Sequence, residues 1–375
     1  MTIRATTAPG LEDVALAEGS RLLSQAGYDL AADSRQVFGL AGVVSWNLGE
    51  PFTVSGFKEA HPLAAARSLF HVAVHVAEVI WDGRALASLL DGIRAIDLEE
   101  MRTATSFRVS CTRVGEHDFQ SPQVEREVGT LLQERYGTRV DLEGYDLQVK
   151  VDITASRAFC GYQLTRRKGL DRRYDWVYHP RVTLRTPIAY GMLVLSGYTD
   201  RPGAIHDPFC GSGTILMEAA GVSRDRHEEP PPISGSDRDP KAVEGARTNL
   251  ERQGLSFISI SACDARQLEA IVLPGSLDYI VTNPPFGIRL ARGTNFRTLY
   301  SGFLAAAVRT LRVGGTLALL VGKRRGVFNR VLQATPELAL EHVRIVEMGG
   351  VYAALFVLRR TAAETAVIDE SGDQV

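Results

Sequence analysis

The sequence predicts two structural halves: an α+β half, then an α/β half with a doubly wound parallel sheet and a terminal antiparallel hairpin. Three observations support this class. Strand-like and helical runs alternate regularly after residue 186, two more strand-like runs flank Gly349-Gly350, and before residue 165 both kinds of run come in short mixed groups. The chain of 375 residues, 45% hydrophobic and 23% charged, is long enough for two or three domains with their own cores.

In the first half, apolar periodicity predicts short amphipathic helices and strands. The last of these helices starts at Ser121-Pro122, because proline suits the first helical position. The expected helices span residues 11–25, 64–69, 84–94 and 121–136. The expected strands span residues 3–7, 72–80, 107–112, 146–153 and 158–164, with a strand and turn over 36–46.

In the second half, a helix over residues 186–196 leads into repeated strand–helix alternation. The expected strands span residues 204–207, 233–237, 257–261, 277–282 and 316–321, and the helices 213–220, 240–252, 296–311 and 327–332. Two strands over residues 340–348 and 353–359 form the predicted hairpin. Residues 361–375 are expected to be a flexible tail.

Composition excludes several classes of protein. A formal net charge of -2 and a pI near 6.5 exclude a polybasic protein that holds nucleic acid by bulk charge, so an acidic partner needs a local patch. The four cysteines lie far apart, without metal-ligand spacing, which predicts neither a metal site nor a disulfide framework. No leader or membrane span is recognisable, so we expect a cytoplasmic protein without membrane contact. No feature specifies an oligomer, and a monomer is expected.

One local patch stands out between the two halves. Between residues 166 and 185 there are seven basic residues, with Tyr174, Trp176 and Tyr178 interleaved. Cations with aromatic rings suit RNA phosphates and stacked bases, and a solvated linker with paired arginines is an equal alternative. The candidate RNA-binding residues here are Arg166, Arg167, Lys168, Arg172 and Arg173.

A glycine-rich turn connects the first strand of the second half to the next helix. It reads Asp207-Pro208-Phe209-Cys210-Gly211-Ser212-Gly213-Thr214. Glycines let the backbone approach a ligand, and the helix start offers free N–H groups, although a simple tight turn has the same pattern. Asp237 and Asp264 end the next two strands, and Asp237 has the spacing of a ribose-binding carboxylate. Either could be only a helix cap, but together these features favour a nucleoside cleft.

A proline-rich loop, Asn283-Pro284-Pro285-Phe286-Gly287, follows the strand over residues 277–282. Two prolines make it rigid, and it lies where open α/β sheets bind ligands. The amide, carbonyl and aromatic ring of this loop suit the binding of a flat base by its exocyclic amine. The alternative interpretation is that the loop only ends the strand and buries its Phe side chain. Just beyond it, Arg289 is a candidate contact for the phosphate of that nucleotide.

The glycine turn and the Asn-Pro-Pro-Phe loop together resemble the S-adenosylmethionine-dependent amino-methyltransferases. The segment over residues 107–115, the helix around Val124 to Val128, and residues 149–164 resemble a THUMP domain. The combination resembles the THUMP-containing RNA guanine-N2-methyltransferases, notably the stand-alone tRNA enzymes that make N2-methylguanosine at position 6. This resemblance implies a ferredoxin-like part (1–65), a THUMP domain (66–168), a basic linker (169–185), a Rossmann-like class I methyltransferase domain (186–360) and the tail (361–375).

The resemblance also implies roles for individual residues. Asp207, Gly211 and Gly213, with Pro208, Ser212 and Thr214 in the same turn, would hold the methionine end of S-adenosylmethionine. Asp237 would bind the ribose hydroxyls and Asp264 the adenine amine, with Arg238 over the adenine face. Asn283 also belongs to the cofactor-binding residues that the resemblance implies. Asn283, Pro284 and Phe286 would form the catalytic loop: a flipped guanine would stack on Phe286 and donate its amine hydrogens to Asn283 and the Pro284 carbonyl.

The same loop signature serves adenine N6 and glutamine amide methylation, so it does not choose the substrate alone. The THUMP-like region decides for RNA. The closest alternative is a 23S rRNA guanine-N2-methyltransferase, and the absence of a second methyltransferase half favours tRNA. A third hypothesis is a non-catalytic RNA-binding protein with a vestigial cofactor cleft.

Overall fold

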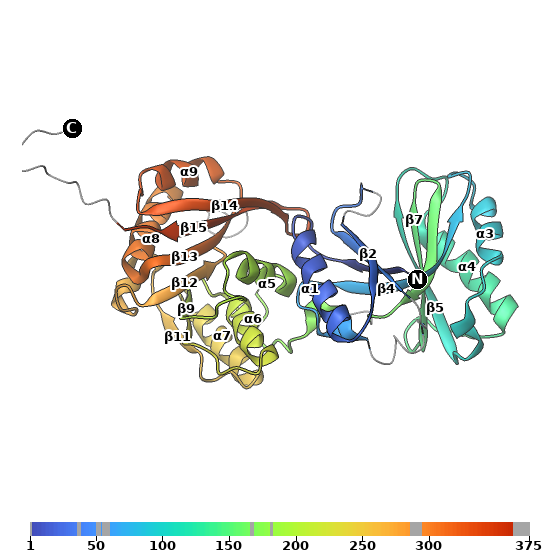
Figure 1. Ribbon diagram of the computed structural model, residues 1–375, viewed down its shortest axis with the longest axis horizontal. Helices are drawn as coiled ribbons and strands as arrows, with labels where there is room; N and C mark the ends of the chain where they lie inside the picture. Colours follow the sequence, from blue (N-terminus) through green and yellow to red (C-terminus); the bar gives the residue numbers. More distant parts are fainter. Residues whose placement is uncertain are drawn as a thin grey trace, which may run out of the picture. The chain divides into compact units, whose positions relative to one another are not determined.

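The computed structural model describes residues 2–35, 39–49, 54, 61–165, 169–180, 183–285 and 295–362. The chain forms two compact units, Met1–Arg172 and Arg173–Val375, each built on one sheet (Figure 1). Residues 1–65 and 66–168 contribute strands to the same sheet. The boundary between these two parts, like the other domain boundaries, stays a prediction.

The first unit contains an eight-stranded mixed sheet in the order β2-β3-β1-β4-β8-β7-β5-β6. Its strands are β1 (Thr2–Thr6), β2 (Leu30–Arg35), β3 (Val43–Leu48), β4 (His71–Ile80), β5 (Ser106–Val114), β6 (Arg139–Val140), β7 (Leu147–Thr154) and β8 (Arg157–Gln163). Its α-helices are α1 (Glu12–Gln25), α3 (Leu86–Arg94) and α4 (Ser121–Tyr136), and 3-10 turns cover Pro62–Ala65, Glu99–Arg102 and Leu170–Arg172. The predicted α+β character is confirmed.

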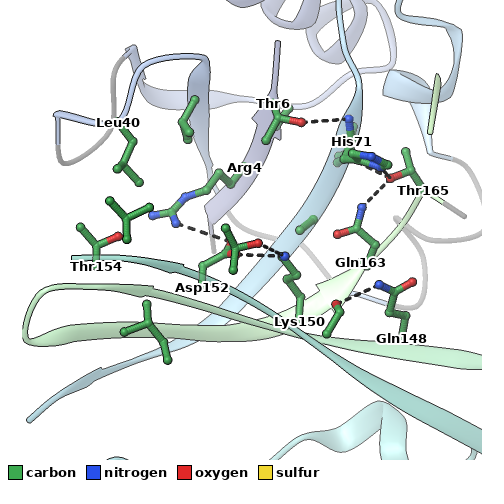
Figure 2. Close-up of a pocket in the computed structure, with 18 of the residues that line it drawn as sticks. Arg4, Thr6, Leu40, His71, Gln148, Lys150, Asp152, Thr154, Gln163 and Thr165 are labelled. Atoms are coloured by element: carbon green, nitrogen blue, oxygen red, sulfur yellow. Dashed lines mark hydrogen bonds and ion pairs between the residues drawn. The ribbon is translucent and has the colours of Figure 1, made fainter. Parts of the chain in front are cut away.

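The two faces of this sheet differ because side chains alternate along each strand. On β7, Val149, Val151 and Ile153 are buried in a core with α3 and α4. The residues between them line a cavity of about 380 Å³ on the opposite face (Figure 2). There, Asp152 contacts Lys150 Nζ at 3.2 Å, His75 Nε2 at 3.2 Å and Arg4 Nη1 at 3.8 Å.

Three local predictions for this unit had different outcomes. The predicted helix over 64–69 was wrong: only the 3-10 turn Pro62–Ala65 forms, because the chain is extended at Ala66 and the N–H groups of Arg67 and Ser68 donate to the Glu18 carboxylate. The predicted strand and turn over 36–46 are confirmed in their described part, with a turn at Gly42 and a strand from Val43. The strand β2 was missed: its sequence Leu-Ala-Ala-Asp-Ser-Arg has no apolar alternation, because it is an exposed edge strand.

The second unit confirms the doubly wound sheet with its terminal hairpin. The strand order is β11-β10-β9-β12-β13-β15-β14. The first five strands in this order, β11, β10, β9, β12 and β13, run parallel to one another, and β15 runs antiparallel to β13 and β14. The strands are β9 (Ile205–Asp207), β10 (Ile233–Asp237), β11 (Ser259–Ala262), β12 (Leu277–Thr282), β13 (Leu311–Val321), β14 (Leu338–Glu347) and β15 (Tyr352–Arg360).

Helices cover both faces of this sheet (Figure 1). One layer comprises α5 (Thr186–Leu195), α6 (Thr214–Asp225) and α7 (Pro240–Arg252), and the other α8 (Phe296–Thr310) and α9 (Arg325–Gln333). The turn Ala265–Ala270 is 3-10. The predicted helix over 296–311 stops at Thr310, and β13 already begins at Leu311, earlier than predicted. The predicted tail lies outside the described residues, apart from residues 361 and 362.

In the described part of the chain, every helix is too short or too polar to cross a membrane.

Candidate active site

Parallel strand pairing brings the predicted site residues to one edge of the second sheet. In β10, Gly235 pairs with Asp207, and Asp237 pairs with Ala262, two residues before Asp264. On the other side of β9, Ile280 of β12 pairs with His206, so that Asn283 follows β12 at the same edge. From β11 to β12, the carboxyl ends therefore present Asp264, Asp237, Asp207 and Asn283 in that order.

The glycine turn between β9 and α6 depends on two glycines in the left-handed region. Gly211 has φ +52° and Gly213 has φ +87°, a conformation that other residues adopt only with strain. The Gly213 N–H donates to the Cys210 carbonyl at 2.8 Å, and the Gly211 N–H donates to Asp237 Oδ2 at 3.2 Å. A Cβ atom on Gly211 would meet nothing nearer than 4.0 Å, so the turn faces open space there.

Asp207 is almost completely buried at the start of this turn, with 2% of its surface exposed. Its Oδ1 accepts hydrogen bonds from Thr282 Oγ1 at 2.5 Å and from the Phe209 N–H at 3.1 Å. Burial raises the pKa of this carboxyl to about 7, and the hydrogen bonds counteract only part of that effect. Asp207 therefore ties the glycine turn to the end of β12.

Asp237 and Asp264 stand at the next two strand ends. Asp237 accepts from the N–H groups of Gly211 and Asp239, and burial raises its pKa. Asp264 caps the following 3-10 turn, as the alternative predicted, and its two oxygens accept from the Arg266 guanidinium at 2.9 and 2.6 Å. These hydrogen bonds lower the pKa of Asp264. Arg238, between them in sequence, is exposed.

Asn283 has a buried and unsatisfied acceptor. Its Oδ1 atom is shielded from solvent and accepts no hydrogen bond from any residue that the structure describes. Such a group carries a free-energy cost unless a ligand supplies a donor. Pro284 is buried next to it, while Phe286 and Arg289 lie outside the described residues.

The predicted basic segment is placed only in part. Arg166, Arg167 and Lys168 lie outside the described residues, and Arg172 is exposed. Arg173 is mostly covered, and its Nε lies 3.5 Å from Oε1 of Glu218, a fully buried carboxylate. Arg173 thus compensates a buried charge, as the linker alternative expects of at least some of these arginines. Its role in RNA binding, like those of the others, stays a prediction.

Sequence reasoning missed Asn249 on α7. Its Oδ1 accepts from the N–H groups of Val177 and Tyr178 at 3.0 and 2.8 Å, and its Nδ2 donates to the carbonyls of Tyr178 and Ser212 at 2.9 and 3.1 Å. This buried amide therefore fixes the segment before α5 to the glycine turn. The available signal was a polar residue beside Leu250 in the apolar stripe of α7.

Tyr178 is a second residue that the sequence did not single out individually. Gly245 makes room for its ring, because a Cβ atom there would come within 2.2 Å of the ring carbons. Burial and the charges of Asp239 and Asp237 raise the pKa of Tyr178. The ring therefore packs against α7 at Gly245, four residues before Asn249 on the same helix. Within the described ranges, no cluster of three or more potential metal ligands occurs.

Comparison with known proteins identifies both units. Residues 84–160 match the THUMP domain, and residues 173–354 match the RMKL-like methyltransferase domain. The tRNA (guanine(6)-N2)-methyltransferase of Thermus thermophilus is 38% identical over 365 residues, which cover 96% of this chain and 100% of that protein.

Solved structures agree. The crystal structure of TrmN from Thermus thermophilus superimposes with a TM-score of 0.75 at 34% identity, covering 96% of this chain and 99% of that one. A methyltransferase crystallised with SAH, SMU.472, has a TM-score of 0.70 at 19% identity, covering 97% of this chain and 99% of that chain, and shares the fold. The chain belongs to the THUMP-containing family of guanine-N2-methyltransferases that includes the Thermus enzyme.

Proposed function

We propose that the protein transfers a methyl group from S-adenosylmethionine to the exocyclic N2 of guanosine at position 6 in the acceptor stem of tRNA, giving N2-methylguanosine. The main supporting observation is that Asn283 Oδ1 is buried without a hydrogen-bond partner among the described residues, at the same edge of the sheet where Asp residues lie at or just after the ends of three neighbouring strands. The Thermus relative is named for this nucleotide and atom. We further propose that the protein works in the cytoplasm as a monomer and needs no metal.

The strand-end residues fit S-adenosylmethionine. Open space at Gly211 admits a ligand close to the backbone, and Asp237 has a carboxylate suited to ribose hydroxyls. In this proposal the turn from Asp207 to Thr214 holds the methionine end, Asp264 the adenine amine, and Arg238 covers the adenine face. When bound, the cofactor supplies an electrophilic methyl group.

The protein's task toward the base is to orient a weak nucleophile. The lone pair of guanine N2 is delocalised into the ring, so the free amine is planar and unreactive. Acceptors at Asn283 Oδ1 and the Pro284 carbonyl bind both amine hydrogens and favour a pyramidal nitrogen with its lone pair exposed. The methylated nitrogen releases one proton to solvent during or after the transfer, and catalysis rests mainly on positioning and oriented dipoles.

The base must leave the helical stack to reach Asn283, because an enzyme cannot reach this atom inside a duplex. We propose that the flipped guanine stacks on Phe286 and that Arg289 holds its phosphate. The THUMP-containing unit and the basic residues Arg166, Arg167, Lys168, Arg172 and Arg173 would bind the acceptor stem, with Arg173 the weakest candidate because it pairs with Glu218.

The test is transfer of labelled methyl groups to unmodified tRNA and, in parallel, to rRNA, followed by nucleoside analysis. N2-methylguanosine in tRNA supports the proposal. Labelled rRNA with unlabelled tRNA would move the protein to the ribosomal branch. No transfer to either RNA, together with no binding of S-adenosylmethionine, would favour the non-catalytic alternative.

A further inference from the structure

The charge of the chain is distributed unevenly around the candidate active site. The 58 residues from Tyr279 to Pro336 contain no Asp or Glu but nine Lys or Arg residues, in a chain with a formal net charge of -2. This stretch runs from β12, through α8 and β13, to the end of α9. The carboxylates of the site, Asp207, Asp237 and Asp264, all lie before it in sequence.

Some of these cations are exposed and available. Arg309 pairs with Glu269 at 2.6 Å, and Arg312 pairs with Asp278, so both are neutralised locally. In contrast, five exposed side chains of this stretch form no ion pair with any described residue. One of them, Arg330, lies further along α9. The other four lie at the start of α8 or between the end of β13 and the start of α9; we call them the basic edge, and they are Arg297, Lys323, Arg324 and Arg325. Because α8, α9 and the loop between β13 and α9 carry no carboxylate, no acid on these elements neutralises them.

Strand register places the basic edge beside Asn283. Thr282 of β12 pairs with Leu319 of β13, so Asn283 and Pro284 run alongside the last residues of β13. Lys323 to Arg325 follow two residues after β13 ends at Val321. The Arg324 guanidinium lies 5.7 Å from the centre of the Phe296 ring, which brings this loop against the start of α8, where Arg297 is located.

The edge of the sheet therefore has two sides. The carboxylates of β9, β10 and β11 lie on one side of Asn283, and the basic edge at β13 lies on the other. Carboxylates suit the hydroxyls and amine of a nucleoside cofactor, whereas clustered, unpaired cations suit a polyphosphate backbone. Asn283 is located where the two ligands would meet.

From this arrangement we infer that the basic edge binds backbone phosphates of the substrate RNA next to the target nucleotide. The inference rests on the proposed function and adds to it a phosphate-binding surface on the methyltransferase unit itself. These contacts position the backbone and carry no sequence information, so they act on affinity for every tRNA alike.

The test compares two triple variants of the full chain. The first, Lys323→Ala/Arg324→Ala/Arg325→Ala, removes three cations of the basic edge. The control, Arg201→Ala/Arg224→Ala/Arg226→Ala, removes three exposed cations near the opposite ends of the strands: Arg201 before β9, Arg224 in the last turn of α6, and Arg226 just after that helix. It matches the first variant in the number of charges removed, although Arg224 and Arg226 pair with Asp225 and Glu228. For each protein, the dissociation constant for unmodified tRNA is measured at several salt concentrations, and the affinity for SAH is measured by calorimetry.

We expect the basic-edge variant to bind tRNA at least ~10-fold more weakly. It should also reduce the magnitude of the slope of log K against log [salt] by about 3, since three cations are removed and each lost phosphate contact reduces it by roughly 1. SAH affinity and the control variant stay at wild-type values. A basic-edge variant that matches wild type, or a control variant that loses as much affinity, overturns the inference.

Two further outcomes separate this inference from the proposed function. If wild type methylates tRNA while the basic-edge variant binds it normally, only the inference fails. If wild type neither binds nor methylates tRNA, the proposed function fails as well. Binding of wild type to phosphatidylserine vesicles that is lost in the basic-edge variant, with tRNA binding unchanged, would assign the surface to a membrane and also overturn it.

Discussion

Two buried polar side chains, Asp152 in the first unit and Asn283 in the second, differ in how many partners they have. In the first unit, Asp152 is surrounded by three cationic or imidazole side chains, Arg4, Lys150 and His75. Burial alone would raise the pKa of Asp152, but the hydrogen bond to His75 and the charge of Lys150 outweigh it and lower that pKa. In the second unit, Asn283 Oδ1 is buried without a partner among the described residues.

This difference separates structural from functional polar groups. A buried charge with several partners holds strands together, because removing any one partner leaves the others uncompensated. A buried acceptor without a partner destabilises the free protein and is explained by a ligand that supplies the donor. Mutation of Asp152 should therefore affect stability, whereas mutation of Asn283 should affect methyl transfer.

The largest effect is expected for Asn283→Ala. Loss of an oriented acceptor at the reacting nitrogen should lower kcat by about 10²- to 10³-fold, judged from the loss of one preorganised hydrogen-bonding group in other enzymes. SAH affinity should remain, because the carboxylates of the cofactor side are untouched. Single-turnover transfer to tRNA measures the first quantity and calorimetry the second.

The matched variant is Asn283→Asp, which keeps an acceptor oxygen at the same place. It should retain clearly more activity than the alanine variant. Equal activity of the alanine variant and wild type would remove Asn283 from the mechanism.

A loss of stability is expected for Asp152→Asn. The cations of Arg4 and Lys150 lose their shared counter-charge, which should lower the free energy of unfolding by about 3 kcal/mol, the size found when one partner of a buried ion pair is removed. Trp46 and Trp81 lie in the first unit and Trp176 in the second, so fluorescence of a Trp176→Phe background reports the unfolding of the first unit.

The control for this prediction is Glu78→Gln, whose side chain is more exposed and pairs with Arg157 in the same sheet. That change should alter stability by less than about 1 kcal/mol. A change in SAH affinity with Asp152→Asn, or equal losses in both variants, would contradict a purely structural role for Asp152.

An intermediate effect is expected for Asn249→Ala. Four backbone groups of Val177, Tyr178 and Ser212 lose their partner, which should cost about 2 kcal/mol of stability and weaken SAH binding because the glycine turn is less firmly held. Calorimetric titration with SAH provides the measurement. The neighbouring Thr248→Ala removes only an exposed hydroxyl on the same helix and should leave both quantities unchanged.

The last prediction concerns the pH dependence of stability. Because the pKa of folded Asp207 is raised to about 7 from 3.8, its contribution to stability is greatest below the unfolded pKa and is lost as pH rises toward and through 7. Asp207→Asn should remove this loss. His206, whose pKa burial lowers to about 4, contributes the opposite slope in both proteins, so the difference between them isolates Asp207.

Calorimetric melting of wild type and Asp207→Asn between pH 4 and 8 tests this point. A constant difference in stability across the range would show that Asp207 does not titrate there.

Sequence periodicity predicted the second unit closely, because its strands are buried between two helical layers and bounded by glycine or proline. The strand Leu277–Thr282 was predicted residue for residue, since Asn283-Pro284-Pro285 must end it. In the first unit, β2 was missed because an exposed edge strand needs no apolar alternation. The alternation of apolar and polar residues thus predicts a strand only when one face of that strand is buried.

The site was predictable only where its residues sit at strand ends. The positions of Asp207, Asp237 and Asn283 followed from strand order and parallel pairing. Asn249 and the basic edge could not be found in this way. Asn249 binds backbone groups that are 37 or more residues away in sequence. The residues of the basic edge lie beside Asn283 only because β12 pairs with β13. The roles of Phe286 and Arg289 stay predictions.

The central claim is that this protein methylates guanosine N2 at position 6 of tRNA. The most direct measurement is methyl transfer to two transcripts of one tRNA, one with guanosine at position 6 and one with adenosine there and its base-pair partner changed to match. The account predicts N2-methylguanosine in the first transcript and no transfer to the second. Equal transfer to both transcripts, or product only in rRNA, would contradict it.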